Sequence, residues 1–273
     1  MNIYGIKDSA NFFVKYKSGA NKGKTFIYSN YATVATNDWT SEQVYAKSKN
    51  VNAIRWDYNR QSTLKVDMEI FDLKWISMIF GSEFVSGDTD ILKREILTVS
   101  TTTTGEGDDA VTTAKAVLSG TPIANSLEVY KLDDDGISHI DELTLATADA
   151  PTAGQYKSAT SGTNSKTELT LNATEFTDGS KIVVFYLEKK TGSKTLTIST
   201  DKFPQNYEIY ADTLIRDTNG DDEFVNIHYL NVKPKSQFTL TMDAGNITTL
   251  SVEFDVLKDS GSEDMATYTI YNA

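Results

Sequence analysis

Along most of the chain, apolar and polar residues alternate with a period of two, which predicts β-strands with one buried face and one solvent-facing face. Residues 64–70 show this clearly, because Leu64, Val66 and Met68 alternate with charged side chains. Residues 182–187 are apolar without interruption and predict a strand that is buried on both faces. The same reasoning predicts further strands at residues 126–132, 167–173, 238–242 and 250–256. We therefore expect a mainly β fold.

Segments rich in glycine, asparagine and aspartate separate these runs and predict tight turns. They lie at residues 19–24, 133–136, 218–222 and 243–246. Only four prolines are present, so few positions lack the N–H group that a sheet needs. Both features favour a large and continuous β-structure.

One segment has a different pattern and predicts a short, mostly buried helix at about residues 72–80. Asp72 can accept a backbone N–H at the start of this helix, and Gly81 can take the left-handed conformation that ends it. Apolar residues share one face at helical spacing, and we expect that face to be buried. They are Leu73, Ile76 and Phe80. Residues 41–48 fit either a second short helix, which Ser41 and Glu42 would begin, or a strand that leads into a loop.

The composition changes near residue 100, where small polar residues become frequent and aromatic residues become rare. Residues 101–190 carry 14 acidic and 7 basic side chains, which is more than half of the excess negative charge of the chain. This stretch has strand patterns of its own and is long enough for a small β-sandwich. We expect it to be inserted into a larger, discontinuous β domain that consists of residues 1–100 and 191–273.

The composition also excludes several kinds of functional site. The absence of cysteine removes disulfides, thiolate metal sites and cysteine nucleophiles, and His139 and His228 are the only histidines. A formal net charge of −12 disfavours a nucleic-acid groove, which needs clustered lysine and arginine. Gly19 and Gly23 lie in a hairpin-like turn, which is the wrong context for a phosphate-binding loop. Without a signal-peptide pattern or an 18-residue apolar run, we expect a soluble protein that is made in a reducing cytoplasm and does not contact membranes.

An acidic segment near residue 220 has part of the spacing of a calcium-binding loop. Asp217, Asn219 and Asp221 occupy alternate positions, as the first ligands of such a loop do. However, Asp222 stands where the loop needs glycine, and His228 stands where it needs a bidentate glutamate. The segment therefore favours a hairpin turn with solvated carboxylates over a metal site.

Catalysis has no clear set of residues in this sequence. Two carboxylates can hydrolyse a glycosidic bond, but 38 acidic residues make some close pair inevitable. Trp75 belongs to the expected helix, and Trp39 and Trp56 remain as exposed aromatic candidates. We expect no catalytic, cofactor-binding or metal-binding residues and no enzymatic activity. A surface- or carbohydrate-binding β module that uses Trp39 and Trp56 as stacking platforms is the alternative.

The order of the segments adds information that no single motif gives. The chain opens with two strand-like segments, FFVKY and TFIYSNYATVATN. A basic turn at residues 55–60 then leads through an alternating strand into the helix, which ends in FGS. The C-terminal part contains a strand, an acidic turn, a strand with a proline-containing link, an alternating strand and the closing SVEFDVLKD. This succession resembles the major tail tube protein of long-tailed bacteriophages over residues 1–98 and 194–260.

The middle segment departs from a minimal tube subunit. VLSGTPIANSLEVY and TDGSKIVVFYLEK are similar to small immunoglobulin-like sandwiches that recur in phage structural proteins. The resemblance thus implies a tail-tube-type β-sandwich or barrel with one short helix, interrupted at residues 101–190 by an immunoglobulin-like insert.

The resemblance also implies a structural virion protein. Its subunits would form hexameric rings that stack into a tail tube, through which DNA passes without sequence-specific binding. Its partners would be other copies of the chain and other tail proteins, such as sheath, baseplate or terminator proteins. The protein would be assembled in the host cytoplasm and reside in the virion tail. The alternative within phage particles is a fibre, baseplate or decoration protein.

Overall fold

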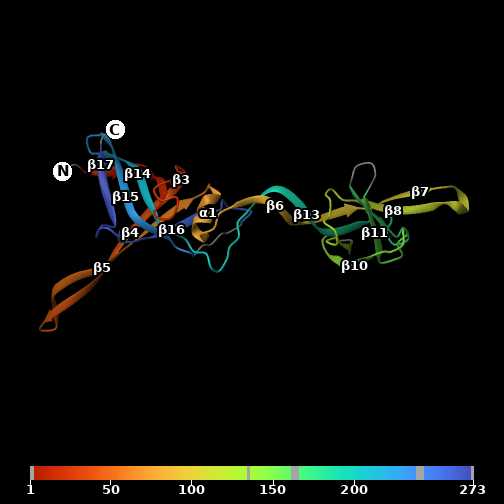
Figure 1. Cartoon of the computed structure of the whole chain (residues 1–273), viewed down its shortest axis with the longest axis horizontal. Helices are drawn as coiled ribbons and strands as arrows, with labels where there is room; N and C mark the ends of the chain where they lie inside the picture. Colours follow the sequence, from red (N-terminus) through yellow and green to blue (C-terminus); the bar gives the residue numbers. More distant parts are fainter. Residues whose placement is uncertain (1–2, 134–135, 161–165, 238–242, 272–273) are drawn as a thin grey trace. The chain divides into compact units, whose positions relative to one another are not determined.

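The computed structural model describes residues 3–133, 136–160, 166–237 and 243–271 (Figure 1). The chain forms two compact units, of which the first consists of residues 1–84 and 196–273 and the second of residues 85–195. Almost all regular elements are strands, which confirms the prediction of a mainly β fold. The predicted strand at residues 238–242 and the tip of the predicted turn at residues 134–135 lie outside the described residues.

The described residues of the first unit form one helix and one sheet of nine strands. The sheet follows the order β3-β2-β14-β15-β16-β5-β4, while β1 adds to β14 and β17 adds to β15. The sheet curls, so that buried residues from distant parts of the chain meet on its inner side. The elements are β1 (Tyr4–Ile6), β2 (Asn11–Tyr16), β3 (Thr25–Ser29), β4 (Ala32–Ser48), β5 (Val51–Met68), α1 (Leu73–Phe80), β14 (Tyr207–Asp217), β15 (Asp222–Pro234), β16 (Leu250–Val256) and β17 (Ala266–Tyr271).

The alternating segments form the centre of this sheet. β5 and β16 pair in register from Leu250 opposite Met68 to Val256 opposite Ser62. Because side chains alternate across a strand, the apolar residues of both strands point to the same inner side. The buried residues that follow the predicted alternation are Leu64, Val66, Met68, Leu250, Val252, Phe254 and Val256.

Helix α1 has the predicted ends but a different buried face. The Asp72 side chain accepts a hydrogen bond from the Lys74 backbone N–H at 2.9 Å, and Gly81 has φ 64°. The buried apolar residues are Trp75, Met78 and Ile79, whereas Leu73 is 46% exposed. The prediction that Leu73, Ile76 and Phe80 form the buried face is therefore wrong. Two apolar stripes run along this helix, and the tilt of its packing on the sheet selects the stripe of Trp75.

The second unit is made of strands that enclose a core of their own. The pairing order is β6-β13-β9-β10-β11-β12-β8-β7, and only two partner pairs join β10 to β11. Residues from both halves of this order, such as Val184 and Leu169, share one buried cluster. The elements are β6 (Val85–Thr98), β7 (Ser100–Thr104), a short 3-10 helix (Gly107–Asp109), β8 (Val111–Val117), β9 (Glu128–Leu132), β10 (His139–Leu145), β11 (Gln155–Thr160), β12 (Thr167–Leu171) and β13 (Lys181–Thr195).

The structure decides one open alternative and corrects one prediction in the N-terminal part. Residues 41–48, for which the sequence allows a helix or a strand that leads into a loop, are the outer part of β4. Residues 55–60 are not a turn but part of β5. The reversal between these strands occurs instead at Lys49 and Asn50. The uninterrupted apolar segment at residues 182–187 does form a buried strand, as predicted, within β13.

Candidate interaction surface

The first unit carries a long antiparallel ribbon, which consists of residues 40–60 of β4 and β5. β5 pairs with β16 only through residues 62–68, so that beyond this point β4 and β5 pair only with each other among the described residues. Lys49 and Asn50 have φ values of 50° and 67°, which are the positive values that a type I′ turn requires. Figure 1 shows the ribbon extending away from the sheet of this unit.

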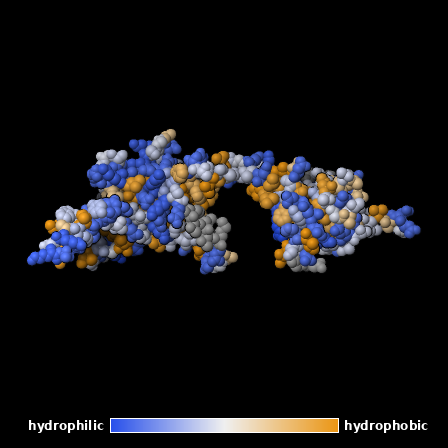
Figure 2. All heavy atoms as spheres, turned by 90° about the horizontal axis from the view of Figure 1, so that it is seen from below, coloured by the Kyte–Doolittle hydropathy of each residue, from blue (hydrophilic) through white to orange (hydrophobic). Residues whose placement is uncertain are grey.

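The ribbon is exposed on both faces, although it carries many large apolar side chains. Trp56 is 52% exposed and Ile54 is 54% exposed. In Figure 2 the ribbon end, at the left, has a hydrophilic tip with hydrophobic residues beside it. An isolated two-stranded hairpin is at best marginally stable in water, so such a ribbon gains from contact with another surface. Its exposed large apolar residues are Val44, Tyr45, Val51, Ile54, Trp56 and Tyr58.

The ribbon is also basic, in contrast to the acidic chain as a whole. Residues 41–60 carry four basic and two acidic side chains, while the chain carries a net charge of −12. Both acidic groups have partners on the ribbon: Arg55 contacts Asp57 at 3.1 Å, and Asn59 donates a hydrogen bond to Glu42 at 2.6 Å. The bond from Asn59 and a further one from Tyr58 lower the pKa of Glu42. Lys47 and Lys49 are thus the charged groups at the tip.

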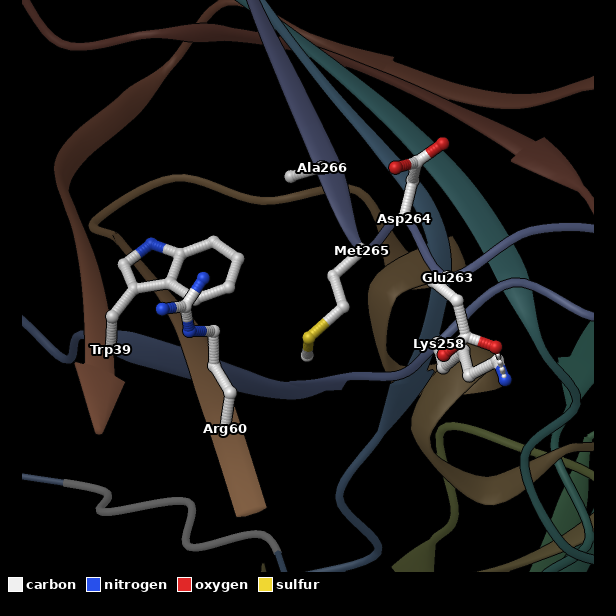
Figure 3. A pocket seen from close by; sticks show the side chains of 7 residues that line it. All are labelled: Trp39, Arg60, Lys258, Glu263, Asp264, Met265 and Ala266. Carbon is white, nitrogen blue, oxygen red and sulfur yellow. Dashed lines mark hydrogen bonds and ion pairs between the residues drawn. The ribbon is translucent and has the colours of Figure 1, made fainter. Parts of the chain in front are cut away.

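A hollow of about 480 Å³ lies where the ribbon joins the sheet (Figure 3). Trp39 of β4 and Arg60 of β5 form one side of it, and the Met265 thioether faces them across the hollow. The Trp39 indole N–H donates to the Asn37 side chain at 2.7 Å, and an ion pair joins Lys258 to Glu263 on the other side. Apolar surface and charges of both signs are therefore available at the base of the ribbon.

A second hollow, which we call the groove, opens on the inner side of the curled sheet. It has a volume of about 290 Å³ and is lined mainly by apolar side chains, which come from β1, β2, β4, β5, β14, β15 and β17 and from the β1–β2 link. Three of the lining residues are alanines, and their short side chains do not fill the concave side of the sheet. They are Ala10, Ala35 and Ala211. Helix α1 does not contribute to the wall of the groove.

Several strand edges of the first unit have no partner strand among the described residues. β3 and β4 end the main order of the sheet, and β17 pairs with β15 on one side only. β17 carries no charged residue, and Tyr268 and Ile270 are at least half exposed. Uncharged edge strands with exposed backbone groups readily pair with another chain.

A row of aromatic rings crosses the outer face of the same sheet. Phe13 lies opposite Tyr28 with a ring separation of 4.7 Å, and Tyr210 stacks on His228 at 4.0 Å. Glu208 accepts a hydrogen bond from Tyr210 at 2.9 Å and lies 2.6 Å from His228 Nε2. Burial, helped by Glu208, raises the pKa of Tyr210 to about 12. His228 is thus part of a surface cluster.

The acidic turn near residue 220 is the hairpin that the sequence favours. Asp217 accepts hydrogen bonds from the backbone N–H groups of Asn219 and Asp221 at 2.8 and 2.9 Å, which closes the turn between β14 and β15. These bonds lower the pKa of Asp217. Asp222 forms ion pairs with Arg216 and, at 4.0 Å, with Lys7. Within the described residues, no group of three or more acidic, histidine or cysteine side chains could hold a metal ion.

The two tryptophans that the sequence offers as exposed candidates, Trp39 of β4 and Trp56 of β5, are both exposed in the structure. Trp39 stands at the base of the ribbon and Trp56 stands farther out, opposite Val44. Sequence reasoning did not find the ribbon itself. A Lys-Asn pair between two β-branched and aromatic segments was the available signal for its turn.

The fold and these surfaces define a β-sheet protein with an exposed arm, open strand edges and an unfilled groove, which are the features of a chain that associates with other chains. No helix in the described part of the chain is long and apolar enough to cross a membrane. The model of the YomU/Tube protein family matches residues 5–270, and the chain belongs to this family. The chain is also similar to the tail tube protein of Bacillus phage SPR, with 23% identity over 266 residues that cover 96% of this chain and 86% of that protein. The resemblance drawn from the order of the sequence segments is thereby confirmed.

Proposed function

We propose that the protein is the structural subunit of a phage tail tube, which assembles with itself into hexameric rings that stack around a central channel. The observation that carries this proposal is the ribbon: in a chain of the tube family, an arm with exposed apolar side chains on both faces is suited to bind a neighbouring subunit. The open edges of β3, β4 and β17 offer further places at which subunits can join.

The charge of the chain supports a passage for DNA. Carboxylates in excess repel phosphates over a distance of about 10 Å at 0.1 M salt, so a channel wall of this composition does not adsorb the genome. DNA then passes without sequence-specific binding. In this proposal the protein resides in the virion tail after assembly in the host cytoplasm. Sheath, baseplate or terminator proteins complete its set of partners.

Shortening the ribbon tests the role in assembly. Glu42 and Tyr58 are directly opposite each other, so an Asn-Gly turn between them removes residues 43–57 without disturbing the sheet. We expect this variant to fold but to form no tubes in negative-stain electron microscopy. The matched control shortens another exposed hairpin, β7–β8, with an Asn-Gly turn between the paired residues Thr103 and Thr112. This control should still assemble. Tubes from the ribbon-shortened variant would contradict the proposal.

We also propose that the second unit is an immunoglobulin-like domain inserted into the tube fold. Val85 and Thr195 are partners in the β6–β13 pair, so the two connections lie about 5 Å apart. A short Gly/Ser linker in place of residues 85–195 should therefore leave the first unit folded, because closing a short loop costs only a few kcal/mol at most. Tryptophan fluorescence reports this directly, since Trp39, Trp56 and Trp75 all lie in the first unit. An insoluble product would contradict an independent insert.

The proposed role requires no catalysis, and assays for glycan, peptide and nucleotide hydrolysis should match buffer with or without divalent cations. A carbohydrate-binding module remains the second candidate, because the exposed indoles of Trp39 and Trp56 can stack on sugar rings. Such a module should stay monomeric and be retained by a glycan column, and it should lose retention when Trp56 is replaced by Ala.

A further inference from the structure

The groove is small and mainly apolar. Its volume of about 290 Å³ lies at the lower end of the range of about 300–1,000 Å³ that small-molecule sites occupy. The exposed wall contains Ile6, Ile227 and Tyr268, so water in the groove meets mainly hydrocarbon. An occupant made of a few apolar side chains fits both the size and the chemistry.

Apart from the Asp8 carboxylate, which accepts a hydrogen bond from the backbone of the next residue, the polar side chains that line the groove form hydrogen bonds with distant parts of the chain. The Asn37 side-chain oxygen accepts hydrogen bonds from Trp39 Nε1, from the Tyr229 hydroxyl at 3.2 Å and from the Tyr268 hydroxyl at 3.0 Å. The Asn37 amide group donates to Ser62 at 2.8 Å. An occupant therefore does not need to bring hydrogen-bonding groups into the groove, which again favours apolar side chains.

One end of the groove leads to negative charge. The inward-facing residues of β14 run from Ala211 and Thr213 in the groove wall to Asp217 in the acidic turn. The turn and the start of β15 hold four carboxylates within seven residues. The ion pairs of Arg216 and Lys7 at this turn are both with Asp222. The apolar groove is thus followed, at the end of β14, by an acidic turn.

The ribbon has the complementary order along its length. Val44 and Trp56 lie opposite each other in its middle, and Lys47 and Lys49 lie toward its tip. From Val44 to Lys49 the strand covers about 17 Å at 3.3–3.4 Å per residue, and from Ala211 to Asp217 β14 covers about 20 Å. Apolar and charged parts are therefore spaced alike on the two surfaces.

We propose that the ribbon of one copy lies in the groove of a second copy, with Val44, Ile54 and Trp56 covering the apolar wall and Lys47 and Lys49 reaching the acidic turn. This inference rests on the proposed tube function and names the partner surface of the ribbon. The occupant is a second copy of the chain, because every copy carries both the basic ribbon tip and the acidic turn that complements it.

A charge exchange tests the contact. Lys49→Glu should raise the protein concentration needed for tube formation by roughly tenfold or more, and Asp221→Lys should do the same. The double variant should recover most of the assembly, because the exchanged charges attract again. Lys22→Glu, which changes an exposed lysine in the β2–β3 loop, is the matched control and should assemble like the wild type. Pelleting by centrifugation measures the assembled fraction.

A cysteine pair tests the position without relying on charge, and the natural chain has no cysteine to interfere. The double variant Val44→Cys and Ala35→Cys should form disulfide-linked ladders in assembled tubes under mild oxidation. In the control, Tyr28→Cys on the outer face replaces Ala35→Cys, and no ladder should form. Suppose that the wild-type protein forms tubes, but the charge exchange does not restore assembly and the cysteine pair at the groove forms no disulfide. This inference is then wrong, while the proposed function is unaffected. Wild-type protein that forms no rings or tubes would overturn the proposed function, and the inference with it.

Discussion

Replacing Gly81 by alanine should destabilise the first unit far more than the same change at Gly19. Both glycines have positive φ, of 64° and 75°, so alanine costs about 1–2 kcal/mol at either position because its Cβ approaches the following carbonyl oxygen. The surroundings differ. A Cβ at position 81 would lie 2.2 Å from the Phe203 carbonyl oxygen, while no atom lies within 4 Å of a Cβ at position 19.

The contact at Gly81 is with backbone, which cannot turn aside as a side chain can. Either residues 203–204 move or the end of α1 shifts, and a shift weakens the hydrogen bond from the Ser82 N–H to the Ser77 carbonyl at 3.2 Å. Overpacking of this kind costs about 1–3 kcal/mol. We therefore expect a total loss of about 2–5 kcal/mol for Gly81→Ala and about 1–2 kcal/mol for Gly19→Ala.

Urea unfolding followed by tryptophan fluorescence is the appropriate assay, because all three tryptophans lie in the first unit and Trp75 is fully buried. Gly81→Asn provides a second comparison, since asparagine accepts positive φ more readily but keeps the Cβ contact. It should remain close to Gly81→Ala. If Gly81→Ala and Gly19→Ala agree within about 0.5 kcal/mol, the close approach of α1 to Phe203 is refuted.

Three further predictions concern buried groups. Trp75→Ala should cost about 3–5 kcal/mol in urea unfolding because it empties the centre of the core, whereas Leu73→Ala on the exposed side should cost less than about 1 kcal/mol. Tyr31→Phe should cost about 1–3 kcal/mol in the same assay, since it removes the acceptor of the buried Trp75 indole N–H at 3.2 Å. Burial raises the pKa of Glu95, but hydrogen bonds, led by that from Lys93, outweigh burial and lower the pKa to about 2. The ionised Glu95 therefore stabilises the fold at pH values above its ordinary pKa of 4.5, and this stabilisation is lost as the pH falls from 4.5 toward 2. Thermal unfolding followed by circular dichroism should show Glu95→Gln less stable than the wild type at pH 6, with the difference shrinking at pH 3.

The parts of the fold that the sequence predicts best are those in which one chain buries its own residues. Val66 and Val252 alternate with charged neighbours because one face of each strand is covered by the same molecule. The ends of α1 were also predictable, since Asp72 and Gly81 act through local hydrogen bonds and backbone conformation. Both signals can be read from a few consecutive residues, although the core that buries Val66 and Val252 joins distant parts of the chain.

The features that were not predicted depend on contacts that a local pattern does not encode. Which stripe of α1 is buried depends on how the helix lies on the sheet, and Trp75 and Leu73 are both apolar. The composition changes at Thr101, whereas the first unit ends at Phe84, because β6 pairs with β13 and carries no distinctive composition. The sequence offers Trp39 and Trp56 as stacking platforms, but spacing does not reveal that Trp56 lies on a ribbon and Trp39 at its base.

The ribbon escaped prediction for a physical reason that also bears on assembly. A strand that is exposed on both faces in the monomer has no alternation, so Val44, Ile54 and Trp56 give no periodic signal. These side chains are exposed, and the groove beside Ala35 is open, as far as the described residues show. If the ribbon of one copy covers the groove of a second copy, the contact joins two different surfaces. The first copy then still has a free groove, and the second copy still has a free ribbon. Such head-to-tail contacts do not stop at a dimer but close into rings or continue without limit, which is the geometry that a tube requires.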